Sequence, residues 1–164
     1  MSPTFAASEV LGAMITPAVL ISASGTLVLS TSNRLTRVVD RVRVLAAEAE
    51  KLRQGEETEE AEARRGLIAG QLPVLSSRVL LLRSALGALY GAIGLLVATS
   101  IAVGLSATLQ WAYSWVPVIS GLAGASALLW GSVLLVREAR IAISSTLEEM
   151  KYLAKEVARL RTPP

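Results

Sequence analysis

The chain has 164 residues, of which 52% are hydrophobic, and its mean hydropathy of +0.54 is too high for a soluble domain of this length. It contains no cysteine, which excludes disulfides and thiolate chemistry, and no histidine, which removes the commonest metal ligand and the usual general base at neutral pH. The net charge is +3, and its distribution is uneven because the first basic residue is Arg34.

The first predicted element is a long helix that begins in an apolar segment and continues into a charged one. Residues 10–32 are apolar over a length sufficient to cross a bilayer, which takes about 20 residues. No Gly or Pro lies between Gly25 and Gly55, so one helix can run through both segments. We expect a transmembrane helix with an amphipathic extension.

Polar side chains share one face of this helix at about 100° per residue. They are Ser22, Thr26 and Ser30 within the span, Asn33 directly after it, and then Arg34, at the edge of the face, Arg37 and Arg41. The hydroxyls can line a polar pathway or bond to backbone carbonyls of their own or a neighbouring helix. The arginines can contact anionic lipid headgroups, form a basic ring in an oligomer, or only set topology and pair locally with Asp40.

Residues 33–83 are predicted to form a helical hairpin. Gly55 suits the end of the first arm, near Gln54, and Thr58 can cap the second. Each arm carries an apolar stripe with alternating steps of three and four residues: Leu35, Val38, Val42, Leu45, Ala49 and Leu52, and then Ile68, Leu72, Leu75, Val79 and Leu82. Gly70 and Pro73 predict a kink or break in the second arm.

Two further spans are predicted at residues 84–109 and 115–136, joined by the uncharged sequence QWAYS at 110–114. Both contain small residues that let helix backbones approach closely, within one chain or between chains. These candidate packing residues are Gly87, Gly91 and Gly94 in the second span, and Gly124 and Gly131 in the third.

Residues 137–161 are predicted to form a further helix outside the membrane. Its apolar stripe consists of Ile143, Leu147, Met150, Leu153, Val157 and Leu160. We expect this stripe to pack on the hairpin. The predicted fold is therefore an all-α integral membrane protein with three transmembrane helices in one membrane domain. Helices 1 and 2 extend into a cytoplasmic hairpin that packs with a C-terminal cytoplasmic helix.

The distribution of arginines predicts the orientation. Arg34, Arg83 and Arg137 border the same side of the three spans, whereas the opposite ends are almost uncharged. The positive-inside rule then places the N-terminus and the QWAYS turn outside, and the hairpin and the C-terminus in the cytoplasm.

The stretch TPAVLISASGTLVLSTSNRLTRVVDRVR at residues 16–43 resembles a family of uncharacterised bacterial membrane proteins, catalogued as domain of unknown function 2721. The similar features are the TPAVLIS start, the LSTSNR junction and the RVVDRVR arm, followed by two more apolar spans. The resemblance implies a bacterial inner-membrane protein. It gives no activity, cofactor or catalytic residue to carry over to this chain.

The chain shows packing surfaces but no pattern typical of an enzyme. No nucleotide-binding loop or metal-ligand spacing appears, and the cations are interleaved with acids, unlike a nucleic-acid site. We therefore expect no enzyme activity and no cofactor, metal or nucleic-acid partner. The sequence favours a structural or accessory membrane protein that associates with itself or with a larger complex. The alternative is an oligomeric channel lined by Ser22, Thr26 and Ser30, with Arg37 and Arg41 at its cytoplasmic mouth.

Overall fold

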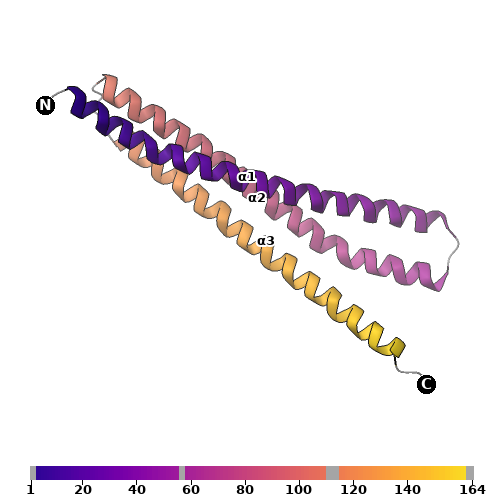
Figure 1. Ribbon diagram of the computed structural model, residues 1–164. Coiled ribbons are helices and arrows are strands. Elements are labelled where there is room, and N and C mark those ends of the chain that lie inside the picture. Colours follow the sequence, from indigo (N-terminus) through magenta and orange to yellow (C-terminus); the bar gives the residue numbers. More distant parts are fainter. Residues whose placement is uncertain (1–2, 56–57, 110–114, 162–164) are drawn as a thin grey trace.

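A computed structural model describes residues 3–55, 58–109 and 115–161 of the chain. It contains three long helices, α1 (Pro3–Gln54), α2 (Glu59–Leu109) and α3 (Trp115–Arg161), and the described residues form no strand (Figure 1). Each helix includes an apolar stretch long enough to cross a membrane. The expected all-helical fold with three membrane-spanning helices is thus confirmed at the level of length and composition.

The three helices are arranged with α2 in the centre. α2 packs along both α1 and α3, whereas α1 and α3 meet at only a few positions. The start of α1, the end of α2 and the start of α3 lie together at one end of the molecule (Figure 1). At the other end α1 and α2 form a hairpin, and α3 diverges from it. A gap between α1 and α3 follows from this arrangement.

Buried side chains of α2 recur every seven residues over almost the whole helix. They are Ala61, Ile68, Leu75, Leu82, Leu89 and Leu96. A second series, Ala85, Ala92 and Thr99, has the same spacing. A strict seven-residue period keeps one stripe facing its neighbours when helices cross at a small angle. One packing register therefore extends from the hairpin into the apolar span.

The packing stripe of α1 has the same seven-residue period, but its side chains are apolar in the hairpin and carry hydroxyls within the apolar span. Val38 and Leu45 are buried against α2 in the hairpin, whereas Ser24 and Thr31 take the equivalent positions within the apolar span. The hydroxyls donate hydrogen bonds to the carbonyls of residues 20 and 27, at 2.5 and 2.6 Å. These bonds satisfy the buried hydroxyls within their own helix.

Glycines on α3 allow it to approach α2 closely. A Cβ atom at Gly124 would lie 3.1 Å from Leu96 Cγ, and one at Gly131 would lie 3.2 Å from Leu89 Cδ2. Near the start of α3, the hydroxyls of Ser120 and Thr99 share a hydrogen bond of 2.9 Å. Small residues and one polar contact thus join these two spans.

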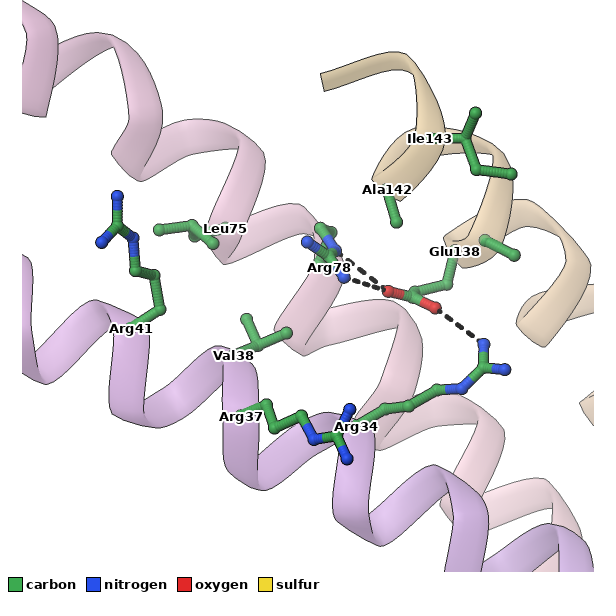
Figure 2. Close-up of a pocket in the computed structure, with 10 residues that line it drawn as sticks. Arg34, Arg37, Val38, Arg41, Leu75, Arg78, Glu138, Ala142 and Ile143 are labelled. Atoms are coloured by element: carbon green, nitrogen blue, oxygen red, sulfur yellow. Dashed lines mark hydrogen bonds and ion pairs between the residues drawn. The ribbon is translucent and has the colours of Figure 1, made fainter. Parts of the chain in front are cut away.

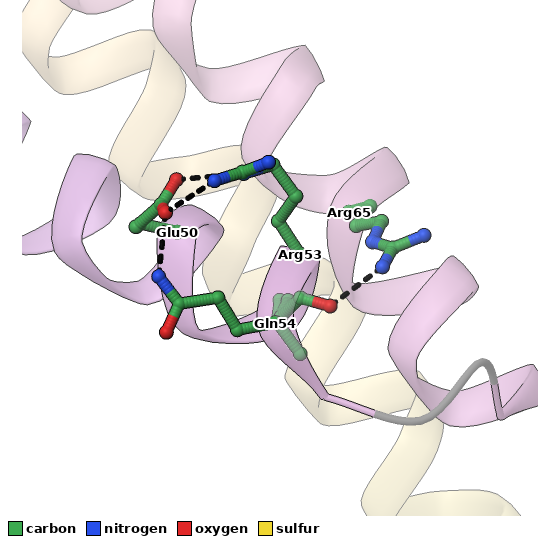
Figure 3. Close-up of polar contacts among 5 residues, drawn as sticks. Glu50, Arg53, Gln54 and Arg65 are labelled. Atoms are coloured by element: carbon green, nitrogen blue, oxygen red, sulfur yellow. Dashed lines mark hydrogen bonds and ion pairs between the residues drawn. The ribbon is translucent and has the colours of Figure 1, made fainter.

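The hairpin end is held by capping and by polar contacts between its arms. Gly55 follows α1 directly, and the Ala61 amide donates to Thr58 Oγ1 at 3.3 Å, so the predicted Thr58 cap is confirmed. Arg64 Nε donates to Glu48 Oε1 at 2.7 Å. Arg65 donates to the carbonyl of residue 52, as Figure 3 shows.

Acidic side chains at this end take part in hydrogen bonds that lower their pKa values. The bond from Arg64 lowers the pKa of Glu48 below its ordinary value. On α1 itself, Arg53 and Gln54 both donate to Glu50, and their hydrogen bonds lower the Glu50 pKa (Figure 3). Glu50 is exposed and Glu48 is partly exposed, so solvent screens these interactions.

Two sequence predictions differ from the structure. Of the predicted kink or break in the second arm, the break is absent: α2 continues through Pro73 from Glu59 to Leu109, with Ile68 and Leu75 buried on either side of the proline. The C-terminal stripe does not pack on the hairpin at Ile143 or Met150, which are 61% and 57% exposed. The divergence of α3 is the physical reason. The side chains of Leu147, Leu153, Val157 and Leu160, and the QWAYS turn, lie outside the described residues.

Candidate functional site

A buried carboxylate occupies the place where the three helices come closest to meeting. Glu138 on α3 is 1% exposed and belongs to the seven-residue packing series of Gly124 and Gly131. An ionised group in such a position is costly unless it is paired and hydrogen-bonded.

Glu138 is paired with arginines from both other helices. Arg78 of α2 approaches Glu138 Oε1 with its Nε and Nη2 atoms, both at 2.9 Å. Arg34 of α1 places Nη1 at 3.6 Å from Glu138 Oε2 (Figure 2). We call these three residues the ion triad. It is the main polar connection between α1 and α3 among the described residues, because these helices have few other contacts.

A groove of about 440 Å³ opens beside the ion triad, between α1, α2 and α3. We call it the arginine groove. Its polar lining consists of Arg34, Arg37, Arg41, Arg78 and Glu138. Val38, Leu75, Ala139, Ala142 and Ile143 supply the apolar remainder (Figure 2). The lining therefore contains four arginines and one glutamate.

The cations of the arginine groove are not equivalent. Glu138 neutralises Arg78, whose side chain is only 22% exposed, and contacts Arg34, whose side chain is 50% exposed. Arg37 and Arg41 make no ion pair with any described residue, and both are exposed. The nearby Asp40 pairs instead with Arg43, at 3.6 Å. The groove consequently has an excess of positive charge.

A second groove, of about 330 Å³, continues from the first along α1 and α3 into the apolar span. We call it the span groove. Arg34 and Ala139 line both grooves. The rest of the span groove is lined by Leu27, Ser30, Thr31, Ser132, Leu135 and Val136. Together the two grooves give the α1–α3 gap a cationic half and a mainly apolar half.

The candidate polar face of α1 points outward. Ser22, Thr26, Ser30 and Asn33 are all exposed, and Ser30 is the one that also lines the span groove. Within this chain, the hydroxyls that face α2 and α3 are instead Ser24 and Thr31.

The candidate packing glycines divide into two groups. Gly124 and Gly131 are buried where α3 crosses α2. Gly87, Gly91 and Gly94 are exposed, and a Cβ atom built on any of them would meet nothing within 4 Å. This second group forms an outward face of α2, which we call the glycine face.

Sequence reasoning missed Glu138, although a signal for it existed. Ser120, Gly124, Ala127 and Gly131 follow alternating steps of four and three residues, and continuing that pattern leads to Leu134 and then Glu138. An acid at a packing position of an otherwise apolar stripe indicates a buried ion pair. Its partners could not be found without the arrangement of the helices.

A family model described as "Protein of unknown function (DUF2721)" matches residues 14–147. The chain belongs to this family. The predicted resemblance to DUF2721 is thus confirmed. Comparisons with curated proteins and with solved structures found no match. The DUF2721 region includes Arg34, Arg78 and Glu138, so the ion triad and both grooves lie inside it. Within the described ranges, no three acidic side chains gather into a metal site.

Proposed function

We propose that the chain is a non-enzymatic integral membrane protein that associates, through the glycine face of α2, with further copies of itself or with a larger membrane complex. The observation that carries this proposal is that Gly87, Gly91 and Gly94 face away from α1 and α3. Small residues four apart allow a second helix to come within backbone contact in a bilayer. α2 packs on both neighbours and still retains this open face.

The site chemistry supports an association role over a catalytic one. In the ion triad, the single buried carboxylate of Glu138 is occupied by Arg34 and Arg78, and these pairs join helices. In the arginine groove the functional groups are guanidiniums, which suit the binding of anions and are poor proton carriers. The proposed role of the protein is therefore that of a structural or accessory subunit.

The proposed location is the bacterial inner membrane, with the N-terminus outside and the hairpin and C-terminus in the cytoplasm. Arg34, Arg83 and Arg137 support this orientation through the positive-inside rule. The shared end of the three apolar segments is consistent with it (Figure 1).

Oligomeric state in liposomes tests the association. The full chain, labelled with one fluorophore, is reconstituted at low density, and photobleaching steps are counted. Gly91→Leu adds bulk on the open face, so we expect it to convert multi-step particles to single-step ones. Gly25→Leu is the matched control, because Gly25 is also an exposed span glycine with nothing within 4 Å of a built Cβ.

Two results would contradict the proposal. One is a wild-type protein that bleaches in single steps and carries no co-purified partner from mild detergent. The other is an equal effect of Gly25→Leu and Gly91→Leu, which would remove the glycine face from the interaction.

A channel is the second candidate function, and the exposed polar face of α1 favours it. Ser22, Thr26 and Ser30 are free of the chain's own helix packing, so several copies arranged around α1 would direct them to a common axis. Arg37 would then stand at the mouth and favour anions. Ion flux from liposomes that does not exceed flux from empty ones would exclude this candidate.

A further inference from the structure

The gap between α1 and α3 has the polarity profile of one lipid molecule. At one end, the arginine groove presents Arg37 and Arg41 without ion-pair partners among the described residues. At the other end, the span groove is lined by Leu27, Leu135 and Val136 within the apolar segments. Arg34 lies where the two grooves join.

We infer that this gap is a binding site for one anionic phospholipid, with the phosphate among the guanidinium groups of Arg37 and Arg41 and an acyl chain along the span groove. Arginine forms strong charge-assisted hydrogen bonds with phosphate oxygens. The inference rests on membrane insertion and does not depend on association through the glycine face.

Two features favour a lipid over other anionic occupants. An acidic peptide or a soluble anion would use the cationic half only, and would leave the apolar half without a matching surface. The cationic half also adjoins the end of the apolar segments of α1 and α3, where headgroup phosphates lie in a bilayer. Along the gap, the cationic half thus lies at the depth of the lipid headgroups and the apolar half lies at the depth of the acyl chains.

The ion triad lies where the two grooves join. Glu138 pairs with Arg34 and Arg78 there, which links α3 to both α1 and α2. Glu138 also cancels part of the charge of these two arginines. Arg37 and Arg41 are therefore the residues whose charge a phosphate would neutralise.

Lipid titration of the full chain in mild detergent, followed by native mass spectrometry, tests the cationic half. The probes are dioleoyl phosphatidylglycerol and dioleoyl phosphatidylcholine. The variant Arg37→Gln/Arg41→Gln removes both unpaired cations, and Arg43→Gln/Lys51→Gln removes two exposed cations of α1 outside the groove. We expect the first variant to lower phosphatidylglycerol affinity roughly 10- to 30-fold, from a typical contribution per cation at a membrane surface, and the control to lower it by less than about three-fold.

The apolar half is tested by filling it. Ser30 is exposed and lines the span groove, so Ser30→Phe obstructs the acyl chain without disturbing the core. This variant should bind phosphatidylglycerol less tightly while its cations remain intact. It also provides a test if the double arginine variant fails to fold, which circular dichroism would reveal.

Each remaining outcome decides against the inference. Equal losses in the groove variant and in its control would indicate non-specific surface charge. Displacement of phosphatidylglycerol by inorganic phosphate or glycerol phosphate at equal concentration would assign the groove to a soluble anion. Unchanged binding by Ser30→Phe would remove the acyl chain from the span groove.

Discussion

Arg78 and Glu138, sixty residues apart in sequence, meet at 2.9 Å and join α2 to α3 at the point where the arginine groove begins. Arg34 reaches the second oxygen of the same carboxylate. One glutamate thus connects all three helices, and its loss leaves two arginines without their partner.

Glu138→Gln should lower the free energy of unfolding by about 2–3 kcal/mol. Breaking a fully buried ion pair costs about 3–5 kcal/mol, and the half-exposed Arg34 reduces the cost here. Thermal unfolding in detergent, followed by circular dichroism, measures the effect. Adding Arg78→Gln should cost less than the sum of the single changes, because the double variant leaves fewer unpaired charges.

Asp40→Asn is the matched control for Glu138→Gln. It removes the partner of Arg43 in an exposed pair at 3.6 Å, so its effect should stay below about 1 kcal/mol. Similar costs for the two substitutions would show that the ion triad does not stabilise the fold.

Gly124→Ala and Gly131→Ala should destabilise the contact between α2 and α3. The added methyl group would lie 3.1 Å from Leu96 at the first site and 3.2 Å from Leu89 at the second, so the buried leucine would have to shift or the helices separate slightly. Overpacking of this kind costs about 1–3 kcal/mol. Unfolding in detergent measures it, with Gly94→Ala as the control because its methyl group would meet nothing within 4 Å. A similar loss at all three positions would refute the close contact.

Acidification should loosen the hairpin end through Glu48. The hydrogen bond from Arg64 lowers the folded-state pKa of Glu48 below its ordinary value, so the contact stabilises the protein above that value. This stability is lost as the pH falls through the lowered pKa, when the carboxylate becomes protonated. The melting temperatures of wild type and Glu48→Gln should differ slightly at pH 7 and converge at lower pH. A difference that does not change with pH would contradict the contact.

Cysteine labelling should report the proposed orientation, since the native chain has no thiol. Single cysteines replace Ser2, Glu57, Ser114 and Thr162, and intact spheroplasts are treated with an impermeant maleimide. Positions 2 and 114 should react, and positions 57 and 162 should react only after lysis. Labelling of position 57 in sealed cells would overturn the orientation and the cytoplasmic basic mouth of the channel candidate.

Local sequence patterns predicted the helices and the hairpin well. The apolar length of each span, the Thr58 cap, and the seven-residue spacing of Val38 with Leu45 and of Leu75 with Leu82 are all readable from one chain. Each depends on residues close in sequence, so helical periodicity is sufficient to find them.

The candidate site was less predictable because it depends on which helices touch. The polar face beginning at Ser22 was identified from its four-residue steps, whereas the buried stripe through Ser24 and Thr31 follows seven-residue steps. Similarly, Gly87 and Gly124 each belong to a series of small residues in an apolar span, and the sequence gives no reason to treat them differently. Only Gly124 faces a neighbouring helix of the chain. The central position of α2 determines these differences, and no local pattern indicates it.

The unbroken packing register of α2 has a mechanical consequence. Residues 59–83 extend beyond the apolar span by roughly 35 Å at 1.5 Å per residue. That reach exceeds the screening length of about 8 Å in physiological salt, so the outer end is electrostatically independent of the lipid surface. Because the same stripe continues inward along one unbroken helix, a load on the hairpin arm acts directly on the part of α2 that carries the glycine face.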